Sequence, residues 1–169
     1  MSVRKITLLA LYTTIALTIF VIESTIPTVV PIPGVKLGLS NIVTLFVIKR
    51  HGAKEAAIVL IMRVILASIF AGQIVSFTYS IAGGFLCLIV MAIINFILRG
   101  EFLFITSVFG AIAHNVGQIL AAFFVLKMSG IFAYIPFLII SGIITGLFTG
   151  FACYFAEKKI PRKLTNEIN

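Results

Sequence analysis

The protein is a chain of 169 residues, of which 61% are hydrophobic and only 11% are charged. Soluble domains are usually about a quarter charged, so this composition excludes a water-soluble globular protein and predicts an integral membrane protein, one domain with several spans. The net charge is +8, and the five acidic residues include no aspartate. This excludes an aspartate-based site for Mg²⁺-diphosphate or for phosphoryl transfer.

The first predicted helix covers residues 6–22, an uncharged run that follows Arg4 and Lys5. The run resembles a signal peptide, but no small-x-small cleavage site follows it, so we interpret it as a retained helix. The next segment, 24–35, contains three prolines and cannot continue a helix. We expect irregular backbone there, at or just below the outer membrane surface, and then a short second span over about 37–48.

Four further helices complete the predicted bundle, with a polar-leaning connection over residues 72–80. The third to sixth spans are expected at about 56–71, 81–98, 102–126 and 134–156. Residues 1–156 therefore form the predicted domain, an all-α membrane protein with six transmembrane helices, and residues 157–169 form a basic tail.

Positive charge is distributed unevenly between the two ends of this bundle. Most Lys and Arg side chains fall on the side of both termini, whereas Lys36 and Lys127 fall on the other side. Because positive charge favours the cytoplasmic side, both termini are predicted to be cytoplasmic in a multi-pass protein of the bacterial cell membrane. The basic excess is thereby explained by the lipid bilayer without nucleic acid, and a contact of the tail with anionic lipid is an open alternative.

Arg63 lies midway along the third predicted span. A charge near the middle of a bilayer costs ~2.5–3.5 kcal/mol on insertion scales, so Arg63 must face the protein interior or a water-filled cavity. Two interpretations follow. Arg63 forms a structural ion pair with Glu23 at the outer end of the first helix, or it anchors an anionic ligand.

His114, Asn115 and Gln118 occupy neighbouring positions on one face of the fifth predicted span. A neutral imidazole and two amides offer both donors and acceptors, which suits a polar headgroup or a heterocycle. The alternative is hydrogen bonding between helices, worth ~0.6 kcal/mol per bond on average. A metal site is not expected, because no second ligand has the required spacing.

A further polar group lies at the start of the second span, where Lys36 precedes Ser40 and Asn41. Free N–H groups and partial positive charge at a helix N-terminus favour an anion or a carbonyl group. The alternative is simple helix capping with a lysine at the interface. The hydroxyl side chains of the predicted connection are candidates to line the same outer cavity: Ser76, Thr78, Tyr79 and Ser80.

Small residues recur at four-residue spacing on the sixth span, at Gly142, Gly146 and Gly150. Such a flat helix face permits close helix packing, either within the chain or against a partner protein. Ala10 and Thr14 make a similar stripe on the first span, with the same two interpretations.

The sequence contains no recognisable catalytic constellation. No serine or cysteine lies beside a base, and no intramembrane carboxylate offers a proton relay, so we expect a binding protein rather than an enzyme and predict no cofactor. Cys87 and Cys153 lie in apolar runs and are interpreted as buried hydrophobes. No Gly-x-x-x-x-Gly-Lys-Ser/Thr loop is present, so any use of ATP requires another chain.

Three segments carry a resemblance to a known family: residues 31–45 (PIPGVKLGLSNIVTL), 76–84 (SFTYSIAGG) and 110–118 (GAIAHNVGQ). In this order they resemble the signatures of the Gx transporter family, also labelled heptaprenyl diphosphate synthase component I. Arg63 stands where the family pattern has an arginine. The resemblance extends from the first helix through the sixth.

That family is similar to the substrate-binding S components of energy-coupling factor (ECF) transporters, six-helix proteins whose outer loop closes over a vitamin-sized ligand. The resemblance implies docking on a separate ECF transmembrane subunit that carries two ATPases. S components often have Ala-x-x-x-Ala on the first helix, where this chain has Ala10 and Thr14. The substrate site implied by the resemblance comprises Lys36, Asn41, Arg63, His114, Asn115 and Gln118.

We therefore expect a substrate-binding subunit for a small molecule, either a flavin-like vitamin or an isoprenoid or quinone precursor. The alternative is an accessory membrane subunit linked to polyprenyl (heptaprenyl) diphosphate synthesis, because a chain without aspartate cannot itself hold Mg²⁺-diphosphate. A stand-alone secondary carrier would show inverted repeats, and no convincing repeat is found in the sequence.

Overall fold

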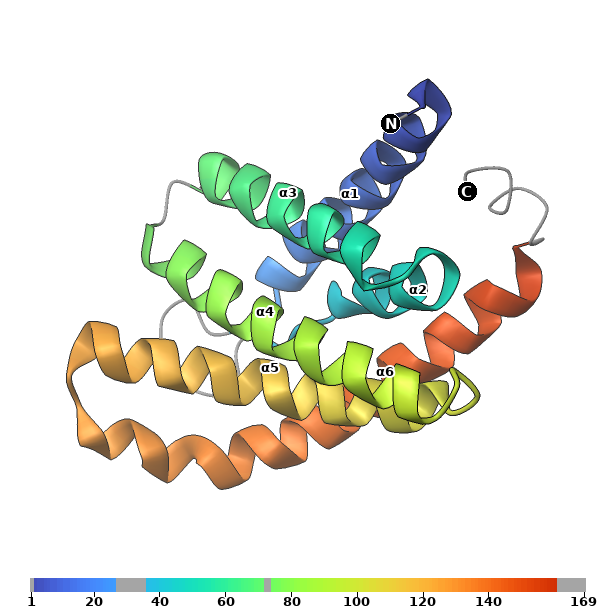
Figure 1. Ribbon diagram of the computed structural model, residues 1–169. Helices are drawn as coiled ribbons and strands as arrows, with labels where there is room; N and C mark the ends of the chain where they lie inside the picture. Colours follow the sequence, from blue (N-terminus) through green and yellow to red (C-terminus); the bar gives the residue numbers. More distant parts are fainter. Residues whose placement is uncertain (1, 27–35, 72–73, 161–169) are drawn as a thin grey trace.

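The computed structural model of this protein describes residues 2–26, 36–71 and 74–160, without the side chains of residues 71 and 74. Within these ranges the chain is helical and contains no strand (Figure 1). The elements are α1 (Val3–Ser24), α2 (Asn41–His51), α3 (Ala53–Ala71), α4 (Ile74–Ile97), α5 (Leu103–Leu126), the 3₁₀ helix η1 (Ser129–Tyr134) and α6 (Ile135–Lys159). The predicted all-α class is confirmed.

Four helical stretches are long and apolar enough to cross a membrane: Val3–Ser24, Val75–Ile97, Leu103–Leu126 and Ser129–Lys159. α2 is different, because its 11 residues extend only about 17 Å. α3 also differs, since it carries Lys54, Glu55 and Arg63. The protein thus has membrane-type helices, while the six spans and the side on which the termini lie stay predictions.

The polar connection predicted over residues 72–80 is wrong for most of its length, because α4 already begins at Ile74. Ser76 and Ser80 lie one helical turn apart, and both are buried. Their hydroxyl groups therefore face other parts of the protein and do not mark a loop. The rest of that connection, and the proline-rich stretch over residues 27–35, lie outside the described residues.

The short helix α2 is bounded by two glycines with left-handed backbone. Gly38 has a φ of +82°, and the chain turns once more before the helix begins at Asn41. Gly52 has a φ of +98° and separates α2 from α3. Glycine adopts such angles without the steric penalty of other residues. α2 therefore lies between two sharp changes of chain direction, and most of its residues are buried.

α4, α5 and α6 pack side by side in sequence order (Figure 1). The glycine face of α6 lies directly on α5: a Cβ atom on Gly146 would be 2.5 Å from the Cα of Val108, and one on Gly142 would be 3.2 Å from the Cα of Ile112. Gly150 likewise lies against Phe104. This face serves packing within the chain, the first of the two interpretations given for it.

Two hydrophobic clusters fill the interior. The larger lies around Tyr12, Phe46 and Leu60 of α1, α2 and α3, and it extends to α4, α5 and α6. The smaller joins α4, α5 and α6 around Tyr79 and Ile119. The outer surface is also apolar, with Phe96 85% exposed. An apolar surface of this extent is expected where lipid replaces water. Other large apolar side chains on it include Ile69, Phe70, Phe124, Ile144 and Phe148.

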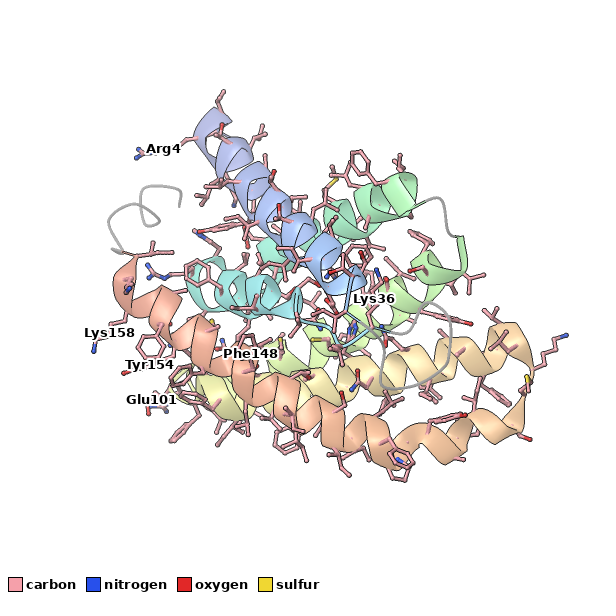
Figure 2. All side chains as sticks on the ribbon, turned by 180° about the vertical axis from the view of Figure 1, so that it is seen from behind. Arg4, Lys36, Glu101, Phe148, Tyr154 and Lys158 are labelled. Carbon is pink, nitrogen blue, oxygen red and sulfur yellow. The ribbon has the colours of Figure 1, made fainter. Side chains whose placement is uncertain are left out.

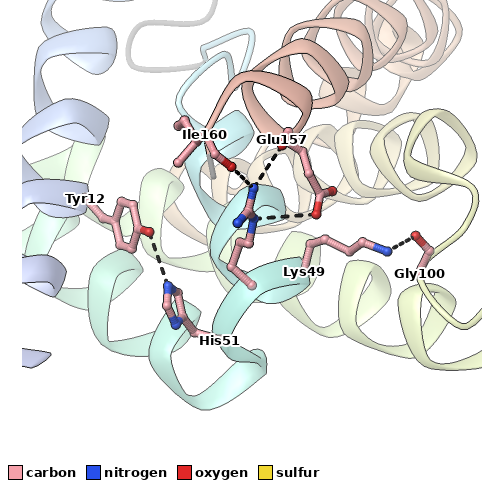
Figure 3. A network of polar contacts seen from close by, with 7 residues as sticks. Tyr12, Lys49, His51, Gly100, Glu157 and Ile160 are labelled. Carbon is pink, nitrogen blue, oxygen red and sulfur yellow. Dashed lines mark hydrogen bonds and ion pairs between the residues drawn. The ribbon is translucent and has the colours of Figure 1, made fainter. Parts of the chain in front are cut away.

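Polar contacts tie several helix ends together at one end of the bundle (Figure 3). Arg50 donates from Nη2 to the carbonyl oxygens of Glu157 at 2.9 Å and Ile160 at 2.7 Å, and so caps the last turn of α6. Lys5 of α1 pairs with Glu55 of α3 at 2.7 Å. We call these residues, with the other members of the network, the basic end: Lys5, Tyr12, Lys49, Arg50, His51, Glu55 and Glu157.

Candidate functional site

A small cavity lies at the opposite end of α2 from the basic end, and we call it the polar cavity. Its volume of about 10 Å³ is room for about one water molecule. It is lined by helices α1, α3, α4 and α5 and by residues 36–40, which we call the segment before α2. Side chains that are distant in the sequence therefore converge there. The lining residues are Phe20, Glu23, Lys36, Gly38, Ser40, Arg63, Ser80, His114 and Gln118.

Arg63 brings a cation into this cavity from the middle of α3. Arg63 is only 3% exposed, and its Nε has no hydrogen-bond partner among the described residues. The carboxylate of Glu23 attracts it electrostatically, although the direct ion pairs within the described chain involve other residues. A buried guanidinium with an unused donor is able to form a charge-assisted hydrogen bond to an anion.

Glu23, at the end of α1, holds the segment that leads into α2. Its Oε1 accepts a hydrogen bond from the backbone N–H of Gly38, and the nearby backbone of Ser40 also favours the charged carboxylate. The carboxylate thus satisfies a backbone donor beside the N-terminus of α2. Glu23 is therefore engaged both by backbone and by the charge of Arg63.

Gly38 is required by the space as well as by its backbone angle. A Cβ atom at this position would lie 2.8 Å from Cδ2 of His114 and 2.8 Å from Nδ2 of Asn41. Any other residue would push the segment away from α5. Glycine therefore lets the segment close over the cavity.

Lys36 is fixed at both its backbone and its side chain. The backbone N–H donates to Oε1 of Gln118 at 3.2 Å, and Nζ lies 3.4 Å from the centroid of the Phe20 ring. This is a cation–π contact. Burial lowers the pKa of Lys36, Arg63 adds to the lowering, and Glu23 opposes it. Lys36 is half-buried and supplies a second positive charge to the cavity wall.

His114 and Gln118 form the α5 wall of the cavity. Oε1 of Gln118 accepts from Lys36, so its Nε2 is the amide nitrogen and donates to Nε2 of His114 at 3.0 Å. The imidazole therefore carries its hydrogen on Nδ1. The α5 wall presents neutral polar groups beside the two cations.

The remaining predicted site residues lie differently. Asn115 donates from Nδ2 to the carbonyl of Leu138 at 2.7 Å and so faces α6. Tyr79 packs in the smaller hydrophobic cluster and does not line the polar cavity. Asn41 is 2% exposed beside Gly38, and neither its Oδ1 nor its Nδ2 has a partner among the described residues.

The structure adds Phe20 and Gly38 to the predicted set. Phe20 is one turn before Glu23 on α1, but an aromatic residue in an apolar span carries no sequence signal of its own. Gly38 follows Lys36 closely, and only the backbone angle reveals its importance. Ser40 and Ser80, which were candidates for an outer cavity, line the polar cavity, while its position on the outer side of a membrane stays a prediction.

The chemistry available in the polar cavity is that of binding. Two cations, one engaged carboxylate and several hydroxyl and amide groups surround it. Among the described residues no group of three or more His, Cys, Asp or Glu side chains is placed to hold a metal ion. The arrangement suits a small molecule with an anionic group.

The sequence profile of the family described as heptaprenyl diphosphate synthase component I matches residues 12–155. The chain belongs to this family. The prediction made from the three segments is therefore confirmed at the level of the family. Neither the curated proteins nor the solved structures contain a match, so the family profile is the comparison on which the assignment rests.

Proposed function

We propose that this chain is a substrate-binding membrane subunit, similar to the S components of ECF transporters, and that the polar cavity binds the anionic group of its cargo. One observation carries the proposal. Arg63 is buried midway along α3, and no described residue accepts a hydrogen bond from its Nε. Burying a cationic donor without an acceptor is unfavourable, and an anionic ligand would remove that penalty.

The charges around the polar cavity indicate that the cargo is anionic. Arg63 and Lys36 are positive, while Glu23 is the acidic residue in the lining and already accepts from the backbone N–H of Gly38. The lining thus has an excess of positive charge when Glu23 is ionised. A carboxylate or phosphate on a flavin-like vitamin, or on an isoprenoid or quinone precursor, matches this excess.

The size of the cavity sets a condition on binding. At about 10 Å³ it does not hold a vitamin-sized molecule. Binding therefore requires the segment before α2 to move away from His114 and Gln118. Glu23 and Gln118 hold this segment through backbone hydrogen bonds, which break and re-form at modest net cost.

Energy for transport would come from partner subunits. The chain has no phosphate-binding loop, so ATP hydrolysis belongs to ECF ATPases attached to a separate transmembrane subunit. Ala10 and Thr14 are exposed on α1 and are proposed to face that subunit. The glycine face of α6 is not proposed, because α5 covers it.

The test is ATP-dependent uptake into vesicles that contain the chain with and without ECF subunits. We expect a small molecule to accumulate only with the subunits and ATP. Arg63→Met should abolish the uptake, whereas Lys127→Met, which removes an exposed cation at the end of α5, should not. Failure to co-purify with ECF subunits, together with no small molecule bound to the purified chain, contradicts the proposal.

The family name favours a second candidate, an accessory subunit in polyprenyl diphosphate synthesis. "Component I" implies a second component, which would hold the Mg²⁺-diphosphate that this chain lacks the aspartates to bind. Co-expression with the second component should then raise its prenyl-transfer rate. A rate that is unchanged by this chain removes the candidate, and prenyl transfer by this chain alone would reverse the ranking.

A further inference from the structure

A second and larger cavity lies on the side of the bundle, and we call it the lateral groove. Its volume is about 140 Å³. It runs between α1 and α6, with α2 as its floor. The lining residues are Tyr12, Ile15, Ile19, Ile42, Val43, Phe46, Ala156 and Ile160.

The lateral groove is apolar along its length. Val43 and Phe46 are buried in its floor, whereas Ile15 on α1 and Ile160 after α6 are exposed on its rims. Tyr12 has the polar atom of the lining, and its hydroxyl is hydrogen-bonded to Nε2 of His51 at 3.2 Å. Nothing in the groove therefore orients a polar ligand, but an apolar chain fits its surface.

Positive charge is concentrated where the groove reaches the basic end. Lys158 and Lys159 are exposed in the last turn of α6, directly before Ile160. Arg4 is exposed in the first turn of α1, and Figure 2 shows Arg4 and Lys158 at the same end of the molecule. Glu157, the acid that precedes these lysines in the sequence, is paired with Arg50 at 3.5 Å.

Arg50 extends this charge to the floor of the groove. Its guanidinium carbon lies 5.3 Å from the centroid of the Phe46 ring, and the same guanidinium holds the last carbonyl groups of α6. The lateral groove is therefore apolar along its length and positively charged at one end. That polarity matches an amphiphile with an apolar chain and an anionic head.

We propose that the lateral groove binds an anionic glycerophospholipid, with one acyl chain along α2 and the phosphate beside Lys158 and Lys159. Charge complementarity selects this occupant over a neutral lipid. The lipid lies between α1 and α6, so it links two helices that both pack on α2.

This inference goes beyond the proposed cargo site. The lateral groove and the polar cavity share no lining residue. Lipid binding can therefore be tested whether or not the chain transports anything.

The experiment measures which lipid stays with the full chain after purification from nanodiscs. The discs contain equal amounts of phosphatidylglycerol and phosphatidylcholine, and bound lipid is counted by native mass spectrometry. Each cation near an anionic headgroup contributes about a fivefold preference. With two lysines beside the phosphate, the wild type should retain phosphatidylglycerol about 30-fold over phosphatidylcholine. The double variant Lys158→Gln, Lys159→Gln should lose most of that preference, about 30-fold in affinity.

Two matched tryptophan variants separate the groove from the general lipid surface. Ile15→Trp places bulk on the groove rim, and Ile144→Trp places the same bulk on an exposed face of α6. Both positions are exposed, so both variants should fold, as checked by thermal unfolding in detergent. Only Ile15→Trp should lose the retained phosphatidylglycerol.

Three results would overturn the proposal. The first is equal retention of both lipids by the wild type, and the second is equal loss in both tryptophan variants. The third comes from adding farnesyl diphosphate as a probe. Stoichiometric displacement of phosphatidylglycerol would assign the groove to prenyl chains, and absence of displacement supports the phospholipid.

Discussion

Two buried arginines show the difference between a structural cation and a cation that is available to a ligand. Arg50, at the basic end, donates to two carbonyl oxygens of the last turn of α6 and lies 3.5 Å from the carboxylate of Glu157. Arg63, in the polar cavity, donates to no carbonyl oxygen of the described residues, and its acid, Glu23, already accepts from the backbone N–H of Gly38. Both are deeply buried. The partners of a charge, rather than its burial, indicate its role.

The largest expected difference comes from removing each charge pair. Arg50→Met with Glu157→Gln deletes charge-assisted hydrogen bonds to the end of α6 and should destabilise the protein by about 3 kcal/mol. Arg63→Met with Glu23→Gln should change stability by less than about 1 kcal/mol, because the amide oxygen that replaces the carboxylate can still accept from Gly38 and desolvation of the pair is avoided. Thermal unfolding in one detergent compares the two.

Equal loss of stability in the two double variants would mean that Arg63 is as structural as Arg50. The comparison would then fail, and the ion-pair interpretation of Arg63 and Glu23 would be favoured.

The next effect compares the two glycines that bound α2. Gly38→Ala places Cβ 2.8 Å from His114 in addition to the strain of a positive φ, so a loss of about 2–3 kcal/mol is expected. Gly52, with φ +98° and ψ 176°, lies in a region that is essentially restricted to glycine, but the Cβ of Gly52→Ala would meet only Oε2 of Glu55 at 3.8 Å, so about 1–2 kcal/mol is expected from backbone strain alone. Unfolding midpoints measure both. If Gly52→Ala is the more harmful change, the close fit of the segment over the polar cavity is wrong.

A smaller effect is expected from the aromatic contact of Lys36. Phe20→Leu removes the ring below Nζ and should weaken the hold on the segment before α2 by about 0.5–2 kcal/mol. Hydrogen–deuterium exchange at the backbone N–H of Lys36 should become faster. Exchange at the N–H of Gly52, at the other end of α2, provides the control and should not change.

The smallest effect is expected at Tyr12, whose hydroxyl contacts His51 at 3.2 Å. Tyr12→Phe should reduce stability by about 0.5–1.5 kcal/mol and leave cargo binding unaffected, because Tyr12 does not line the polar cavity. A small shift of the unfolding midpoint with unchanged ligand retention is the predicted pair of results. Reduced retention would show that the two regions are coupled.

The sequence predicted the helices well, because long apolar runs and their charged ends define helices in a membrane. The prediction was wrong over residues 74–80, where several hydroxyl side chains are typical of a loop. This stretch is helical, because a helix forms the hydrogen bonds of its own backbone N–H and C=O groups. The start of α2 was also predicted too early, because the positive φ of Gly38 is not visible in the sequence.

The candidate site was predictable only in part. Lys36, Arg63, His114 and Gln118 were singled out as polar groups in apolar surroundings, and the polar cavity brings them together. Helical spacing placed Asn115 beside them, but adjacent residues on a helix diverge by about 100°, and Asn115 faces α6. Tertiary packing determines which helices meet at the polar cavity. Neither composition nor spacing therefore predicts that Phe20 lies there.

The central claim is that Arg63, together with His114, binds an anionic small molecule. The most direct measurement is native mass spectrometry of the small molecule that travels with the purified chain. The wild type and Lys127→Met should carry the same bound species, and a folded Arg63→Met, His114→Leu variant should carry at least tenfold less. Undiminished binding by that folded double variant would contradict the account.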